Sequence, residues 1–152
     1  MTAALAACGG FLVAIVWMDL IFDVQVLAHR ETGGALPEPA LASIAAYYRR
    51  ATTDSRPMSR LIAAVMAIAV LGSLYRLVAG DGSFAFRVLA LLLCFAPAAL
   101  ALSRVVPNAV RLGQRADDVA KQSALARSIC RDHLLCIALI GAFTLVQIAA
   151  PG

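Results

Sequence analysis

The chain has 152 residues, of which 62% are hydrophobic and 14% are charged, and its mean hydropathy is +0.85. Soluble domains are about half apolar and about a quarter charged, so this composition excludes an ordinary soluble domain of the same length. The formal net charge of +4 does not call for a nucleic acid as partner, because the Arg residues lie where membrane topology places basic residues.

Four stretches without any acidic, basic or His residue predict four transmembrane helices. These stretches are residues 2–18, 61–75, 88–103 and 134–152. Each is somewhat shorter than the ~20 residues of a full span, but flanking Arg side chains extend the usable length because they bend towards the lipid headgroups. We therefore expect one all-α domain, an integral membrane four-helix bundle. Its spans are expected at approximately 3–28, 58–78, 84–106 and 129–149.

The loop between the first two spans predicts a short helix of its own. Gly33 and Gly34 interrupt the first helix, and the Pro-rich residues 36–39 are typical of a helix start. Residues 40–52 then predict an amphipathic helix with Tyr47 and Tyr48 near its end. Aromatic and basic side chains together are typical of a membrane–water interface, so we expect this helix to lie there.

The third loop predicts a helical extension beyond the membrane. The third helix is expected to continue past Pro107 towards Gly113, and the next one to begin at Asp117 or Asp118, because acidic residues suit a first helical turn. Residues 119–131 contain no helix-breaking residue. The third and fourth spans should therefore form a helical hairpin that projects from the bilayer.

The basic residues predict the orientation of the chain. All of the 13 Lys and Arg residues except Arg76 and Arg87 lie in the first or the third loop. Basic residues concentrate in cytoplasmic loops, so loops 1 and 3 are expected in the cytoplasm and both termini outside. The expected location is the cell (inner) membrane, with the chain crossing it several times.

Two acids in the first span are the main functional signal. Asp19 and Asp23 are four residues apart and share one helical face with Arg30. Asp19 lies ~16 Å along the axis from Arg30, which places it inside the hydrocarbon if Arg30 marks the edge. Each such charge costs roughly 2.5–3.5 kcal/mol on insertion scales. Acids at this depth usually face the bundle interior and have a partner or a function.

Polar residues on the third and fourth helices supply candidate partners, which leaves two interpretations. Arg104, Asn108, Arg111 and Arg115 share one face, and Arg127, Arg131, Asp132 and His133 lie near the start of the fourth span. In the structural interpretation, the two acids form ion pairs with Arg104, Arg111 or Arg131 that fix helix register, and the other Arg residues bind lipid phosphates. In the functional interpretation, these groups line a polar cavity open to the cytoplasm. The catalytic candidates are Asp19, Asp23 and His133, and the substrate-binding candidates are Gln25, Arg104, Asn108, Arg111, Arg127 and Arg131.

No His-rich motif supports a metal site. The two His residues are not in an HxxxH or ExxH arrangement, and His29 lies off the face that carries the two acids. We therefore expect no metal and leave the cofactor open.

The segment from Pro107 through Asn108 to Arg111, together with residues 127–133 at the start of the fourth span, resembles the anthrone-oxygenase-like family of small four-helix membrane proteins. The resemblance covers the C-terminal third of the chain and the overall layout. It implies oxidation of an aromatic or quinone-like substrate without an obvious cofactor.

These observations predict a membrane-embedded enzyme or ligand-binding bundle for a small amphipathic ligand that is lipid-, quinone- or polyketide-like. The lipid bilayer is the other expected partner, and a homo-oligomer is left open. Two alternatives remain: a small oligomeric proton- or ion-coupled transporter, and a non-catalytic accessory membrane subunit that binds a partner through its cytoplasmic hairpin.

Overall fold

The computed structural model describes residues 1–29, 34–79 and 83–149. Throughout these ranges the chain forms helices and no strand, which confirms the all-α prediction. The helices are α1 (Thr2–Asp23), η1 (Val24–His29), α2 (Glu38–Arg49), η2 (Arg50–Asp54), α3 (Arg56–Ala79), α4 (Phe84–Leu100), η3 (Ala101–Val105), α5 (Val106–Gln114) and α6 (Val119–Ala149). Arg30 and Gly33, used above to mark the membrane edge and a break, lie outside the described residues.

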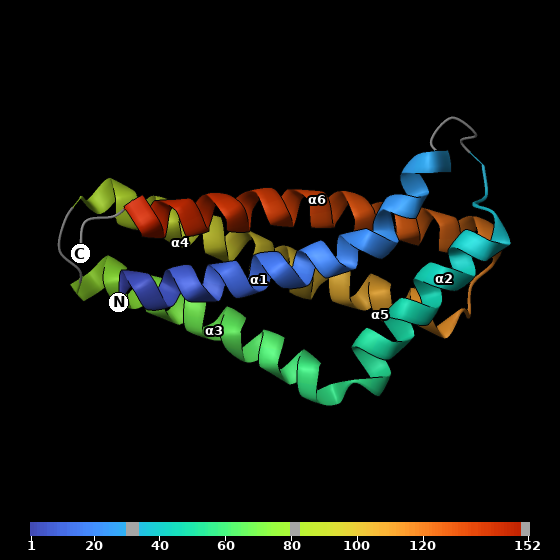
Figure 1. Ribbon diagram of the computed structural model, residues 1–152, viewed down its shortest axis with the longest axis horizontal. Helices are drawn as coiled ribbons and strands as arrows, with labels where there is room; N and C mark the ends of the chain where they lie inside the picture. Colours follow the sequence, from blue (N-terminus) through green and yellow to red (C-terminus); the bar gives the residue numbers. More distant parts are fainter. Residues whose placement is uncertain (30–33, 80–82, 150–152) are drawn as a thin grey trace.

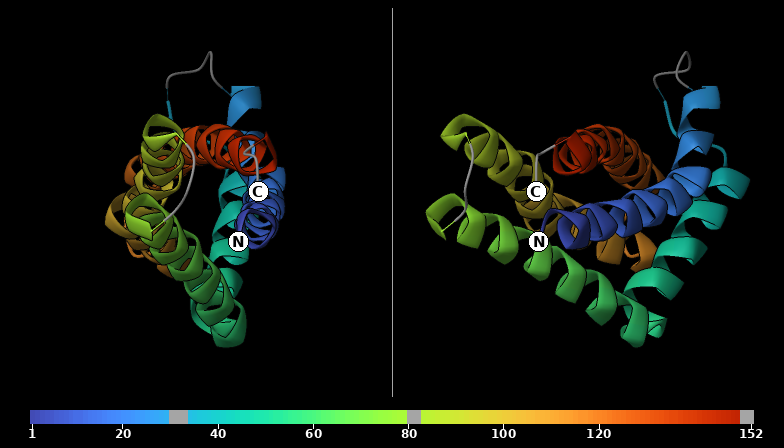
Figure 2. Two further views of the ribbon diagram at one scale, coloured as in Figure 1. Left: turned by 90° about the vertical axis from the view of Figure 1, so that its left-hand side faces the viewer. Right: turned by 60° about the vertical axis from the view of Figure 1, so that its left-hand side comes forward.

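Four helical stretches of the described chain are long and apolar enough to cross a membrane, so the protein is a multi-pass membrane protein. They are Thr2–His29, Pro57–Ala79, Phe84–Gln114 and Val119–Ala149. The long helices α1, α3, α4 and α6 follow one another around the bundle, and each packs against two neighbours (Figure 2). The start of α1 and the end of α6 lie at one end of the bundle, and α2 lies at the other (Figure 1).

The membrane part of the bundle is held together by apolar side chains in two clusters. The cluster nearer the termini joins Leu5, Ala69, Ala90, Cys94 and Phe143, and the next one joins Leu12, Val16, Leu20, Cys136 and Ile140. α1 and α6 approach closely at Gly9, where a Cβ atom would overlap the Thr144 hydroxyl and lie 3.1 Å from the Phe143 ring. A side chain at this position would require these α6 side chains to shift.

Polar groups mark two levels along the bundle axis. At the end with the termini, Arg76 donates a hydrogen bond of 3.0 Å to Gln147, and Arg87 donates one of 3.2 Å to the Arg76 carbonyl. Towards the other end, exposed Arg60 lies on the same helix as Arg76. The two are separated by 16 positions, or about 24 Å of helix. The layer between the two polar levels is apolar, and it is slightly thinner than the ~30 Å hydrocarbon core of a typical bilayer.

Helix α2 closes one end of the bundle. Its buried residues, Leu41, Ile44, Ala45 and Tyr48, recur at helical spacing and pack on α5 and α6. The crossing with α5 is so close that a Cβ atom on Gly113 would lie 2.8 Å from the backbone nitrogen of Arg49. The apolar stripe of α2 therefore faces the bundle, and its position at the membrane–water interface stays a prediction. An apolar stripe fits a protein surface as well as it fits lipid, and here it covers the bundle.

Helix α3 diverges from α1 as it approaches α2 (Figures 1 and 2). Among the described side chains of α3, only Ala69 and Ser73 are buried, and both lie in its second half. Its first half, residues 57–68, contributes only partly buried side chains such as Ile62 and Met66 to the core. This half of α3 is thus the most weakly packed part of the four spans.

The third span contains a π-helical segment, η3, between α4 and α5. Pro107, two residues after the end of η3, has no N–H to donate to the backbone, which favours an irregular turn at this point. In η3 the Val105 side chain is buried in the core, whereas the Arg104 side chain is 45% exposed.

Candidate functional site

Five side chains from three helices meet beneath α2, and we call them the Asp–His cluster. Asp19 and Asp23 come from α1, Tyr47 and Tyr48 from α2, and His133 from α6. Their positions follow from the apolar stripes of these helices. Asp23 continues the buried face of α1, Tyr48 ends the buried face of α2, and His133 lies on the buried face of α6.

Asp23 is fully buried, and both of its carboxylate oxygens have partners. The Tyr48 hydroxyl donates to Oδ1 at 2.6 Å, and His133 Nδ1 lies 2.6 Å from Oδ2. An ionised carboxylate only accepts hydrogen bonds, so this geometry places a proton on Nδ1. Asp23 is therefore closed off from any other molecule.

Asp19 is held more loosely. The Tyr47 hydroxyl donates to its Oδ1 at 2.5 Å, while its Oδ2 lies 3.6 Å from His133 Nε2, too far for a hydrogen bond. The Asp19 side chain keeps 17% of its exposure. His133 thus lies between two carboxylates, hydrogen-bonded to Asp23 and in looser electrostatic contact with Asp19.

The two tyrosines are permanent hydrogen-bond donors. Burial raises the pKa of both phenols, and the nearby carboxylates raise it further, so neither loses its proton at any physiological pH. Tyr47 is also fixed by the ring of Phe22, which stacks on it at 4.1 Å between centroids and 10° between planes. The tyrosines therefore tie α2 to α1 through the two acids.

A partly open cavity of about 240 Å³ lies between the four long helices and ends at the Asp–His cluster. Most of its lining is apolar, as with Leu12 and Phe143. Its polar lining side chains belong to the end near α2. They are Asp19, Tyr48, Thr52, Ser59 and His133. Asp19 is therefore a carboxylate at the end of an apolar cavity.

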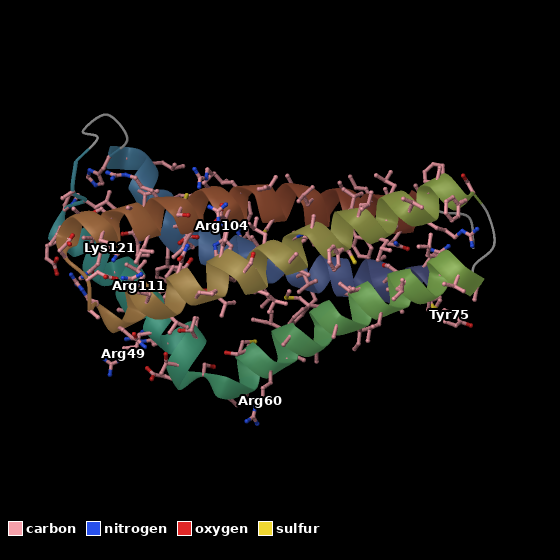
Figure 3. All side chains as sticks on the ribbon, turned by 180° about the vertical axis from the view of Figure 1, so that it is seen from behind. Arg49, Arg60, Tyr75, Arg104, Arg111 and Lys121 are labelled. Atoms are coloured by element: carbon pink, nitrogen blue, oxygen red, sulfur yellow. The ribbon has the colours of Figure 1, made fainter. Side chains whose placement is uncertain are left out.

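The predicted Arg residues form separate contacts around this cluster. Arg104 lies 3.2 Å from buried Asp132 and donates to Ser128 at 3.3 Å, and the exposed Arg131 lies 3.8 Å from the same carboxylate. Figure 3 shows Arg104 between the third and fourth spans, with Arg111 and Lys121 nearer the α2 end. Asp132 is thus neutralised by Arg104 and Arg131.

The remaining predicted residues support the end of the bundle. Arg111 holds Asp117 through two hydrogen bonds of 2.6 and 2.7 Å, which lower the pKa of Asp117. Arg127 donates to the Gly34 carbonyl at 2.7 Å, and Gln25 donates to Ser43 at 3.2 Å. These contacts fix the start of α2 and the turn between α5 and α6.

One residue of the predicted Arg-rich face is not where the sequence suggested. Arg115 leaves the face because α5 ends before it and its backbone is left-handed, with a φ of 52°. It forms an ion pair of 2.8 Å with Glu38 of α2. Asn108 is half-buried, and the described residues give it no hydrogen-bond partner.

The structure thus brings together Asp19, Asp23 and His133, and it keeps the predicted Arg residues away from both acids. The hypothesis that an Arg pairs with Asp19 or Asp23 is wrong, because His133 and two tyrosines occupy those positions. The tyrosines were missed as site residues. Their signal was present, since Tyr48 continues the apolar stripe of α2.

The cluster can hold charge but has no metal-binding arrangement. Among the described residues, no three His, Cys, Asp or Glu side chains are grouped so that they could bind a metal ion. The cluster is a network of two acids, two tyrosines and one imidazole, in which the carboxylate of Asp19 remains accessible.

Comparison with known proteins gives one match. The chain matches the model of the SHR3 chaperone family, described as ER membrane protein SH3, over residues 1–149. No curated protein and no solved structure matches the chain significantly.

This match corrects several predictions. The match covers nearly the whole chain and names a family other than the anthrone-oxygenase-like one, so the predicted resemblance is wrong. The segments that suggested the resemblance, Pro107 to Arg111 and residues 127–133, are too short to identify a family. The family description names a chaperone, so the predicted enzyme or ligand-binding bundle is wrong, and the transporter is wrong with it. The small amphipathic ligand was the substrate of that enzyme and is not retained. The family supports the other alternative, an accessory membrane subunit. Its description also names the ER membrane, where we expected an inner membrane.

Proposed function

Because the chain belongs to the SHR3 chaperone family, we propose that it is a non-catalytic chaperone of the ER membrane, which binds other multi-pass membrane proteins while they fold. The observation that carries this proposal is the family match over residues 1–149. The proposed partner is a transmembrane segment that has not yet packed against the rest of its own protein.

The shape of the bundle supports a partner within the membrane. The first half of α3 has no buried residue and diverges from α1, which leaves apolar surface for another helix. Large apolar side chains are exposed there, with Leu61 at 48% and Ile68 at 56%. Helices associate in lipid through close packing and interhelical hydrogen bonds, and an incompletely packed helix is suited to exchange partners.

The thickness of the apolar layer supports the ER membrane. About 24 Å separate Arg76 from Arg60 along α3, and the ER bilayer is a few Å thinner than the plasma membrane. In the ER, the predicted orientation places both termini in the lumen and α2 with the α5–α6 hairpin in the cytoplasm. A homo-oligomer stays a prediction, which the mass of the protein in nanodiscs would test.

Depletion of the chain in its native cell tests the proposal. We expect a subset of multi-pass proteins to move from the detergent-soluble to the aggregated membrane fraction, measured by quantitative proteomics, and to return when the wild-type chain is restored. Single-pass proteins are the internal control. An unchanged distribution of multi-pass proteins after depletion would refute the chaperone function.

A further inference from the structure

The Asp–His cluster carries more acid than base. Asp19 and Asp23 share the single imidazole of His133, and none of the described Arg or Lys side chains is ion-paired to either acid. Charges inside a membrane are costly unless they are paired. The arrangement therefore leaves room for one further positive charge.

Only Asp19 can accept such a charge from another molecule. Asp23 is fully buried, and both of its oxygens are already hydrogen-bonded. Asp19 lines the cavity, keeps part of its exposure, and has its Oδ2 without a hydrogen bond to His133. Asp19 is thus the carboxylate of the cluster that lines the cavity and is not fully hydrogen-bonded.

The cavity end offers further acceptors beside Asp19. The hydroxyl of Thr52 donates to the Tyr48 carbonyl at 2.7 Å, and the hydroxyl of Ser59 donates to the Ala51 carbonyl at 2.9 Å. Both residues also line the cavity, and their hydroxyl oxygens keep lone pairs for a donor. A carboxylate with two hydroxyl oxygens suits the three N–H donors of an ammonium group.

The weakly packed half of α3 separates this site from the lipid. Ser59, Ile62 and Met66 line the cavity from this half of α3, and none of them is buried, whereas Ala69 further along the helix is. The site also lies at membrane depth, since His133 is 14 positions, or about 21 Å of helix, from Gln147 at the other polar level. A side chain from a neighbouring transmembrane helix would approach Asp19 here.

We propose that Asp19 receives a basic side chain, Lys or Arg, from the transmembrane segment of a folding partner. This proposal rests on the proposed chaperone function, and it names the feature of the partner that the chaperone recognises. A basic residue in an unpacked span is costly until its own protein supplies an acid. Asp19 supplies that acid temporarily, while the apolar walls of the cavity accept the methylene groups of the side chain.

The test uses synthetic transmembrane peptides of about 20 Leu and Ala residues, with Lys, Gln or Leu at the position level with Asp19. Binding to the full chain is measured in nanodiscs. We expect the Lys peptide to bind the wild-type chain at least about tenfold more tightly than the Leu peptide, with Gln between them. Asp19→Asn should remove this preference and leave binding of the Leu peptide unchanged.

Asp132→Asn is the matched control, because it removes a buried acid of similar depth that does not line the cavity, and it should keep the Lys preference. Equal binding of Lys and Leu peptides by the wild-type chain would overturn the proposal. This comparison uses the wild-type chain alone, so it does not depend on whether a variant folds. A Lys preference that persists in Asp19→Asn would overturn it as well. In either case the depletion experiment still decides the chaperone function separately.

Discussion

A substitution at Gly113 tests how closely α2 packs on α5. A Cβ atom there would lie 2.8 Å from the Arg49 backbone nitrogen and 3.0 Å from its Cα atom. Ordinary contact begins near 3.4 Å, so Gly113→Ala must move one backbone away from the other by more than half an ångström. No side-chain rotation relieves this overlap, because both atoms it meets belong to the backbone.

Two effects compete in Gly113→Ala. Overpacking costs typically about 1–3 kcal/mol, and a contact between backbones belongs in the upper part of that range. Alanine gains about 1 kcal/mol over glycine in a helix. The net loss should therefore be about 1–2 kcal/mol, which corresponds to a fall in Tm of about 2–8 °C for a chain of this size.

The assay is thermal unfolding in nanodiscs, with Gly10→Ala and Gly141→Ala as controls. A Cβ atom at either control position meets nothing within 4 Å, so these variants should be as stable as the wild type or more stable. Displacement of α2 should also speed thiol labelling of Cys130, which is 1% exposed beneath it. A Gly113→Ala variant as stable as Gly141→Ala, with Cys130 still protected, would refute the close crossing.

Three further predictions concern the same end of the bundle. Tyr48→Phe removes the donor to buried Asp23 and should cost about 1.5–3 kcal/mol, whereas Tyr75→Phe, at an exposed position, should change the Tm little. Arg115 lowers the pKa of Glu38 through their hydrogen bond, so this ion pair stabilises the start of α2 above the ordinary Glu pKa, and the contribution is lost as the pH falls through the lowered value. Hydrogen exchange in the first turn of α2 should therefore rise in Glu38→Gln at neutral pH and match the wild type in strong acid; equal exchange at neutral pH would speak against it. In sealed ER vesicles, an added protease site in the turn between α5 and α6 should be cut from the cytoplasmic side, and one at Ser83 should be protected; the reverse pattern would show the opposite orientation.

The four spans and the paired acids could be predicted from the sequence because both depend on local properties. Composition identifies a span without any knowledge of its neighbours. A spacing of four places Asp19 and Asp23 on one face of any helix. The face they share was also expected to point inward, because a charged side chain in lipid is costly unless it is paired.

The partners of those acids could not be predicted, since they come from helices far apart in the sequence. Arg104, Arg111 or Arg131 was the expected partner of the acids, and only the packing of α6 decides that His133 faces Asp23 while Arg104 faces Asp132. Tyr48 lies on an amphipathic helix, whose pattern is the same for a membrane surface and for a protein surface. The same residue types also serve enzymes, transporters and chaperones, which is why the function was predicted wrongly.

The π-helical segment η3 has a consequence for the length of the third span. A π-turn contains one residue more than an α-turn, so η3 carries an extra residue within Ala101–Val105. Deleting one residue there would convert the segment to regular α-helix and leave α4 and α5 facing the same neighbours. A deletion elsewhere in the span would rotate all that follows by about 100°. The third span therefore has one place at which it tolerates shortening, and that place lies beside the Arg104–Asp132 ion pair.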